Sequence, residues 1–240
     1  MSETRKVYFL RLIGRCFVLL LGILLYIYRP HEFSVMEGTN FFSRFSVLHI
    51  LWAVWIADMI IQLLPIKAHI SIGSQKQFLK MFRPIRENFN YNKLKNYIIS
   101  TTKSAYKVFI IWCLVTVGIG ALHDRGIIDS AAVLLISIFF YVCDLICVLI
   151  WCPFRLIMKN RCCTTCRIFN WDHLMMFSPF IFVRGFFTQT LLVFAFAIWL
   201  VWELCVMMYP ERFWEVTNTA LQCSQCTDKL CTQYCQKLRR

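Results

Sequence analysis

Residues 131–151 read AAVLLISIFFYVCDLICVLIW, an apolar stretch long enough to cross a membrane as one helix. A helix rises about 1.5 Å per residue, so the roughly 30 Å hydrocarbon layer takes about 20 residues. The stretch is apolar all round, whereas a helix at the surface of a soluble protein shows a polar face. We therefore predict a transmembrane helix here, ended by Cys152 and Pro153.

The rest of the chain carries further stretches of the same kind. Its 240 residues are 59% hydrophobic, above the roughly 45–50% of soluble domains, and the mean hydropathy is +0.59. This composition excludes an ordinary soluble protein and predicts an all-α integral membrane helical bundle in contact with the lipid bilayer. Besides 131–151, the predicted spans are 8–28, 45–64, 106–122 and 190–209, with 173–187 as a short or re-entrant segment.

Positive charge is concentrated in two of the connections between spans. Residues 65–107 carry nine Lys and Arg against one acid, Glu87, and residues 152–171 carry four against none. Basic residues are retained on the cytoplasmic side, so loops 65–105 and 152–171 and the N-terminus are predicted to be cytoplasmic. The charge at 65–107 also predicts contact with anionic lipid headgroups. No recognition motif accompanies it, so we expect no nucleic-acid partner.

Residues 172–209 are too many for one straight span and few for two. If 173–187 crosses or re-enters the membrane, the tail 210–240 is cytoplasmic. If it lies in the interface, the tail is outside and five spans remain. Because the tail is mildly basic, we favour a bundle of about six transmembrane or re-entrant helices in 1–209, followed by a cytoplasmic tail.

Two clusters of cysteines lie in basic segments outside the spans. RCCTTCR at 161–167 and LQCSQCTDKLCTQYCQ at 221–236 each contain a Cys-x-x-Cys pair. Such a pair places two thiolates on one turn, and two pairs complete a tetrahedral metal site. We predict a small structural zinc site that clamps loop 152–171 to the tail. The four ligands are Cys163, Cys166, Cys223 and Cys226, with Cys162, Cys231 and Cys235 as alternates.

Three other interpretations of these cysteines stay open. Four thiolates also suit an iron–sulfur cluster, although this spacing is not a common ferredoxin one. The thiols could instead act as a thiol–disulfide relay, and either case would make the protein a redox component of the membrane. They could also be unliganded. No Ser-His-Asp set, phosphate-binding loop or His-Glu-x-x-His motif is present, so we lean against an enzyme.

Three carboxylates fall inside predicted spans, namely Asp58, Asp144 and Glu203. An ionisable group in lipid is costly, so each should face the bundle interior and find a partner. Asp58 and Asp144 lie in the cytoplasmic halves of their spans, where they could meet. We favour a packing role, and the alternative is an ion or proton transporter that uses all three. The candidate partners are His49, Gln62 and Arg184.

Two other polar residues near the spans receive simpler assignments. Arg15 follows the start of the first span closely, so we expect its side chain to extend to the cytoplasmic face. His173 ends the first cysteine loop. We expect it to be an interfacial aromatic residue in preference to a fourth metal ligand.

The stretch RCCTTCRIFNWDHLMMFSP at 161–179, with YPERFW at 209–214 and the QCSQCTDKLC tail, resembles a family of uncharacterised prokaryotic multi-pass membrane proteins. The resemblance covers the chain from about Trp151 onward and, less clearly, the QKQF segment. It implies a prokaryotic plasma-membrane location and that the two cysteine clusters belong together. It implies no activity, and a protein partner or an oligomer is compatible with it.

Overall fold

The computed structural model describes residues 3–63, 82–85, 91–159 and 166–222, and within them the chain is helical and has no strand. Four helices are long and apolar enough to cross a membrane. This confirms the all-α class and is consistent with an integral membrane bundle. The four are α1 (Glu3–Tyr28), α4 (Tyr91–Asp124), α5 (Ser130–Leu149) and α8 (Phe186–Met208).

Shorter elements connect and accompany these helices. The longest is α2 (Val47–Leu63), which is apolar but has only 17 residues. The others are η1 (Pro30–Met36), η2 (Asn40–Phe42), α6 (Arg155–Met158), η4 (Phe169–Trp171), α7 (Asp172–Phe177), η5 (Ser178–Phe182), η6 (Pro210–Phe213) and η7 (Thr219–Leu221).

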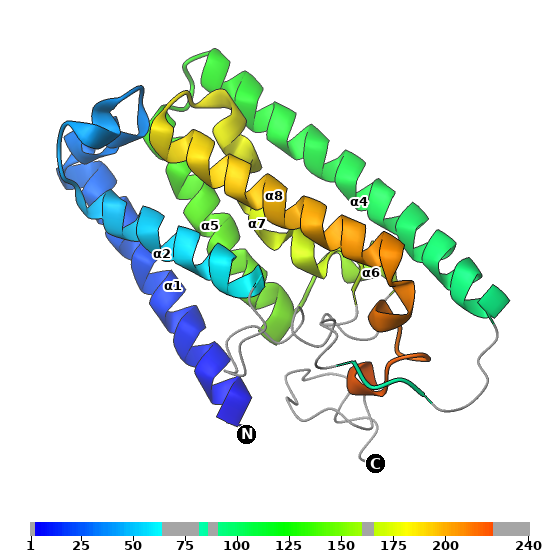
Figure 1. Cartoon of the computed structure of the whole chain (residues 1–240). Helices are drawn as coiled ribbons and strands as arrows, with labels where there is room; N and C mark the ends of the chain where they lie inside the picture. The colour runs from blue at the N-terminus through cyan, green and yellow to red at the C-terminus, as the bar shows by residue number, and fades with distance from the viewer. Residues whose placement is uncertain (1–2, 64–81, 86–90, 160–165, 223–240) are drawn as a thin grey trace.

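The helices run between two ends of an elongated bundle (Figure 1). We call the end formed by residues 29–46, 125–129 and 183–185 the upper end. The lower end is formed by residues 82–85, 150–159, 166–168 and 209–222. The outward face of α1 is apolar and exposed, with Leu10 70% and Ile13 64% accessible. A face of this kind contacts the lipid bilayer.

The helix α1 lies along α5. Gly22 allows the close approach, because a Cβ there would lie 3.0 Å from Leu135 Cδ2. Lower down, Tyr8 and Leu12 pack against Val142 and other apolar side chains of α5. Helix α5 starts where its sequence provides a cap, since the Asp129 carboxylate accepts a hydrogen bond from the Ala132 N–H at 2.7 Å.

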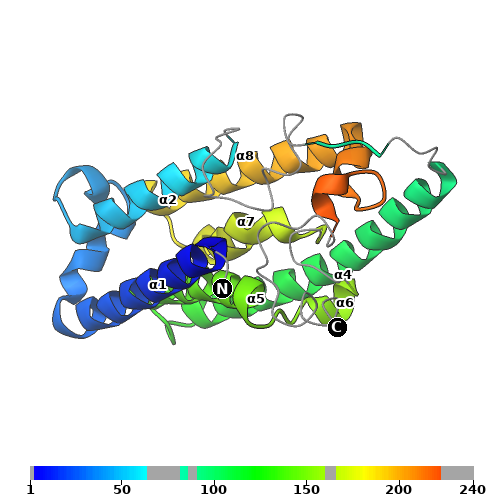
Figure 2. The ribbon, with the colours of Figure 1, turned by 90° about the horizontal axis from the view of Figure 1, so that it is seen from below.

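An interrupted segment, α7 followed by η5, occupies the interior of the bundle. Viewed from below, α7 lies between α5 and α8 (Figure 2). Phe177 and Phe180 stack with ring centroids 5.7 Å apart, and both side chains are fully buried. Trp55 of α2 meets Phe177 edge to face. Pro179 lacks an N–H, and at this position the α-helix gives way to a 3₁₀ turn.

The upper end joins this segment to the connection between α1 and α2. Gly38 donates a hydrogen bond to the Arg184 carbonyl at 2.9 Å, and its own carbonyl accepts one from Phe186 at 3.1 Å. Glu37 accepts a further bond from Ser130 at 2.7 Å. Residues 172–185 therefore pass through the interior of the bundle and join its upper end.

Gly185→Ala is expected to destabilise the fold by at least about 2 kcal/mol. A Cβ at this position would lie 1.8 Å from the Met36 carbonyl oxygen, which is backbone, so the bridge to Gly38 would have to open. The measurement is the free energy of unfolding in mixed detergent micelles. Gly118→Ala is the matched control, since no atom lies within 4 Å of its new Cβ. Equal stability of the two variants would contradict the prediction.

Three predicted boundaries differ from the structure by four residues or more. Helix α1 begins at Glu3, five residues before the predicted span. Helix α4 begins at Tyr91, so the predicted span 106–122 is only the apolar part of a longer helix whose first turns are polar. Helix α8 begins at Phe186, four residues before the predicted span, because Gly185 separates it from the interrupted segment. Of the predicted tail 210–240, residues 210–222 are described and pack at the lower end.

Candidate functional site

Most of the predicted metal site lies outside the described residues. This applies to Cys162, Cys163, Cys223, Cys226, Cys231 and Cys235, whereas Cys166 is described. Within the described ranges, no group of three or more His, Cys, Asp and Glu side chains is arranged to hold a metal ion.

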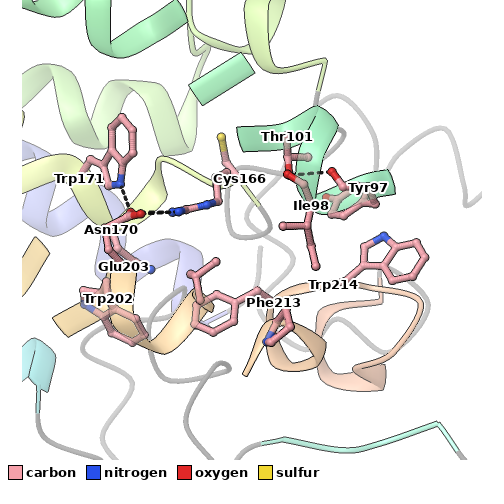
Figure 3. A pocket seen from close by; sticks show the side chains of 13 residues that line it. Tyr97, Ile98, Thr101, Cys166, Asn170, Trp171, Trp202, Glu203, Phe213 and Trp214 are labelled. Atoms are coloured by element: carbon pink, nitrogen blue, oxygen red, sulfur yellow. Dashed lines mark hydrogen bonds and ion pairs between the residues drawn. The ribbon is translucent and has the colours of Figure 1, made fainter. Parts of the chain in front are cut away.

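Cys166 lies in a small pocket at the lower end, about 30 Å³ in volume (Figure 3). Four parts of the chain line it: the first turns of α4, the segment from Cys166 to Trp171, the last turns of α8, and the start of the tail. Tyr97 of α4 stacks on Trp214 of the tail with ring centroids 5.0 Å apart. The pocket therefore brings Cys166 and the start of the tail together beside α4.

An ion pair fixes the segment after Cys166 to α8. Arg167 makes two parallel hydrogen bonds to the Glu203 carboxylate, one of them at 2.7 Å. The Trp171 indole N–H donates a third, also at 2.7 Å. Both charged side chains are less than a fifth exposed. The carboxylate predicted to lie in the last span thus finds its partner at the lower end of the bundle.

The start of the tail is also bound to the 82–85 segment. Thr219 donates from its backbone N–H to the Arg83 carbonyl at 2.9 Å, and Ile85 donates to Thr217 at 3.2 Å. The buried Asn218 side chain donates to the Arg212 carbonyl at 2.9 Å. These contacts hold the residues that lead into the second cysteine cluster against the lower end.

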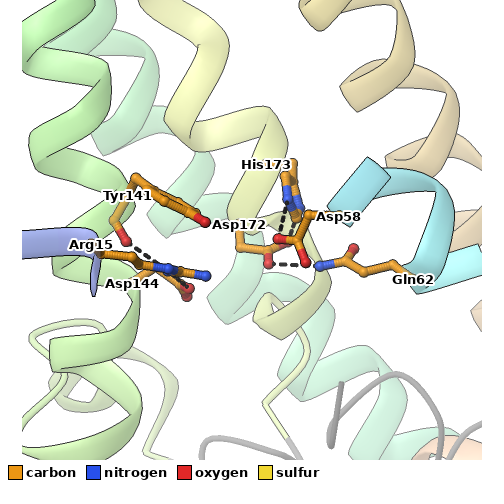
Figure 4. Close-up of polar contacts among 7 residues, drawn as sticks. All are labelled: Arg15, Asp58, Gln62, Tyr141, Asp144, Asp172 and His173. Carbon is orange, nitrogen blue, oxygen red and sulfur yellow. Dashed lines mark hydrogen bonds and ion pairs between the residues drawn. The ribbon is translucent and has the colours of Figure 1, made fainter. Parts of the chain in front are cut away.

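A second polar cluster lies in the interior of the bundle (Figure 4). Arg15 of α1 donates to Asp144 of α5 at 2.8 Å and to the Tyr141 carbonyl at 2.6 Å, and its guanidinium lies 3.7 Å from the centroid of the Tyr141 ring. The expectation that Arg15 extends to the cytoplasmic face is therefore wrong. A carboxylate inside α5 is costly without a partner, and Arg15 provides one.

The other half of the cluster centres on His173 of α7. Its Nε2 lies 3.5 Å from Asp58 Oδ2 of α2, and its Nδ1 lies 3.2 Å from Asp172 Oδ1. Gln62, one turn below Asp58, donates to the second oxygen of Asp172 at 3.1 Å. The His173 side chain is only 5% exposed, so the expectation of an interfacial aromatic residue is wrong.

Two predicted partners lie elsewhere. His49 is at the upper end, where Nε2 meets the Phe41 carbonyl at 2.8 Å and Nδ1 meets Ser46. Arg184 is exposed in the upper connection. The structure also divides the three carboxylates, because Asp58 and Asp144 belong to the interior cluster and Glu203 belongs to the lower-end ion pair.

The interior cluster separates two cavities. A groove of about 590 Å³ lies between α1 and α2, and Arg15 and Asp58 line it. A cavity of about 280 Å³ lies among α4, α5 and α7, and Asp144 and Asp172 line it. Apart from these charges and Arg11, Arg155 and Tyr141, both linings are mostly apolar. Four cysteines also line the smaller cavity, namely Cys143, Cys147, Cys152 and Cys166.

The fold and its contacts define an all-helical bundle with apolar helices of membrane-crossing length and two charged clusters, one interior and one at the lower end. No family model, curated protein or solved structure matches the chain. The resemblance to prokaryotic membrane proteins therefore stays a prediction.

Proposed function

We propose that the chain is a plasma-membrane protein that crosses the bilayer six times, with a structural zinc site on its cytoplasmic side. Cys163 and Cys166 of loop 152–171, with Cys223 and Cys226 of the tail, are the four ligands. The zinc ion clamps the loop to the tail and so fixes the last two crossings to the rest of the bundle.

The six-crossing arrangement is supported by the course of residues 172–185, which leave the loop 152–171, pass through the interior of the bundle and reach the upper end. With this segment counted, the described parts of the loop 152–171 and of the tail belong to the lower end. Residues 82–85, 152–159 and 166–168 of the strongly basic connections also belong to that end, and retention of positive charge favours its assignment to the cytoplasm.

The observation that carries the zinc proposal is that Cys166 and the start of the tail line one pocket. Cys166, the last cysteine of the first cluster, lines the pocket together with Phe213 and Trp214, which precede the second cluster. The ion pair of Arg167 and Glu203 holds one side in place. The contacts of Thr217 and Thr219 with the 82–85 segment hold the other.

The chemistry of the ligands favours a structural role over a catalytic one. Four thiolates fill the tetrahedral coordination of zinc and leave no position for water or substrate. Binding of this kind contributes folding free energy, about 10–16 kcal/mol in small zinc peptides. Arg161 and Arg167 flank the first pair, and their charges offset part of the negative charge of a four-thiolate centre.

The test is elemental analysis of the detergent-purified protein, and about one zinc ion per chain is expected. The double variant Cys163→Ser/Cys226→Ser should lose it, because two thiolates cannot hold the ion alone. Cys16→Ser/Cys113→Ser is the matched control, since both thiols are exposed on α1 and α4 and should leave the zinc content unchanged.

Three results would contradict the proposal. An unchanged zinc content in the Cys163→Ser/Cys226→Ser variant would show that these cysteines are not the ligands. Iron in the purified protein, together with a visible absorption band, would show that the site holds an iron–sulfur cluster and not zinc. Labelling of Cys231 by an impermeant reagent outside intact cells would place the tail on the wrong side.

A further inference from the structure

His173 lies between two carboxylates that line different cavities. Asp58, 3.5 Å from Nε2, lines the groove between α1 and α2. Asp172, 3.2 Å from Nδ1, lines the cavity among α4, α5 and α7. The imidazole itself lines neither of them. It is the one side chain that contacts both carboxylates among the residues that the structure describes.

The two cavities lead to opposite ends of the bundle. The groove extends past Leu25 and Val47, the residues that border the upper connection between α1 and α2. The cavity extends down to Cys152 and Phe169, which belong to the lower end. The interior cluster therefore lies between a groove that reaches toward the upper end and a cavity that reaches the lower end.

The charges of the cluster do not balance. Asp58, Asp144 and Asp172 face one guanidinium, that of Arg15, and one imidazole. One negative charge therefore remains in the described part of the cluster even when His173 is protonated. Ionisable side chains inside membrane segments mark proton relays as well as packing contacts, and a carboxylate without a balancing cation is a group that can take up a proton.

The contact between His173 and Asp172 is close but is not aligned as a hydrogen bond. Nδ1 of His173 and Oδ1 of Asp172 are both buried, and neither has a hydrogen-bond partner within the described ranges, although they are 3.2 Å apart. The distance is within hydrogen-bond range, so the contact lacks only the alignment of donor and acceptor. Such a contact can be made and broken as the proton moves.

We propose that Asp58, His173 and Asp172 form a proton relay between the groove and the cavity. In one direction, protonated Asp58 gives its proton to Nε2 of the neutral imidazole. The imidazolium then releases the proton of Nδ1 to Asp172, which passes it to the cavity. One proton enters and one leaves, and rotation of the ring restores the starting tautomer. The reverse direction uses the same steps.

The groups that face His173 come from each neighbouring helix. Asp58 and Gln62 come from α2, and Asp172 precedes His173 on α7. Arg15 of α1 and Asp144 and Tyr141 of α5 form the adjacent half of the cluster. Glu203 of α8 is bound by Arg167 and Trp171. The protonation of Asp58, His173 and Asp172 therefore depends on the charges of the neighbouring Arg15–Asp144 ion pair.

The experiment measures proton entry into vesicles of phosphatidylethanolamine and phosphatidylglycerol that contain the full-length protein and a pH-sensitive dye. A potassium diffusion potential drives the protons. Wild-type vesicles should acidify faster than protein-free vesicles, and His173→Gln should reduce the rate to that of protein-free vesicles. Glutamine fills similar space but cannot accept and release a proton at neutral pH.

His49→Gln is the matched control, because it removes an imidazole from the upper end of α2 and should keep the wild-type rate. If His173→Gln does not elute as a folded protein in gel filtration, Asp58→Asn takes its place with the same expected loss. Wild-type vesicles that acidify no faster than protein-free ones would overturn the relay, and so would a folded His173→Gln or Asp58→Asn variant at the wild-type rate.

Discussion

Arg15→Met is expected to lower the free energy of unfolding by about 3–5 kcal/mol, because it leaves the Asp144 carboxylate buried without its partner. The Arg15 side chain is 13% exposed and makes three interactions, with the Asp144 carboxylate, the Tyr141 carbonyl and the Tyr141 ring. Methionine fills much of the same volume as arginine. The loss of unfolding free energy therefore measures the missing charge and not a cavity.

The double variant Arg15→Met/Asp144→Leu separates the two causes. Removing both charges abolishes the cost of an unpaired carboxylate, so stability should return to near the wild-type value or above it. Arg184→Met, at an exposed arginine of the upper end, is the control and should change stability by less than about 0.5 kcal/mol. If the double variant were as unstable as Arg15→Met, the unpaired Asp144 carboxylate would not be the cause of the lost stability.

Glu203→Leu is expected to cost a similar amount, about 3–5 kcal/mol, because two donors lose their acceptor at once. Arg167 would be left as a mostly buried cation, and the Trp171 indole N–H would be left unpaired. Thermal unfolding of the detergent-solubilised protein, followed by circular dichroism, is the measurement. Arg167→Met/Glu203→Leu should recover most of the loss.

Asp124→Asn is the matched control for a carboxylate. Asp124 is 72% exposed and its contact with His123 is 3.8 Å long, so its removal should have little effect. If Glu203→Leu unfolded at the wild-type temperature, the Arg167–Glu203 pair would not be what attaches the segment after Cys166 to α8.

The class of the fold was predictable because the signal is local. An apolar run such as 131–151 identifies its own helix by length, without reference to any other part of the chain. The interruption at Pro179 was equally visible, because a proline removes a helical hydrogen bond wherever it lies. The local pattern left the start of α4 undecided, because its polar first turns fit a solvated linker as well as an extension of the membrane helix.

The partners of the buried charges could not be predicted in the same way, because they depend on which helices are neighbours and how each is rotated. His49 and Arg184 were plausible from composition, yet both lie at the upper end. One signal was available and was missed. Arg15 lies 13 residues before the end of α1 and Asp144 lies 14 after the start of α5, so both are about 20 Å from the upper end.

The shortness of α7 and η5 has a consequence for biosynthesis. Six α-helical and five 3₁₀ residues rise about 19 Å, well below the thickness of the hydrocarbon layer. On its own, this segment would be a poor substrate for insertion from the translocon. It can settle at its final depth only when α8 follows and the earlier helices already surround it, so a nascent chain released before α8 would retain four crossings.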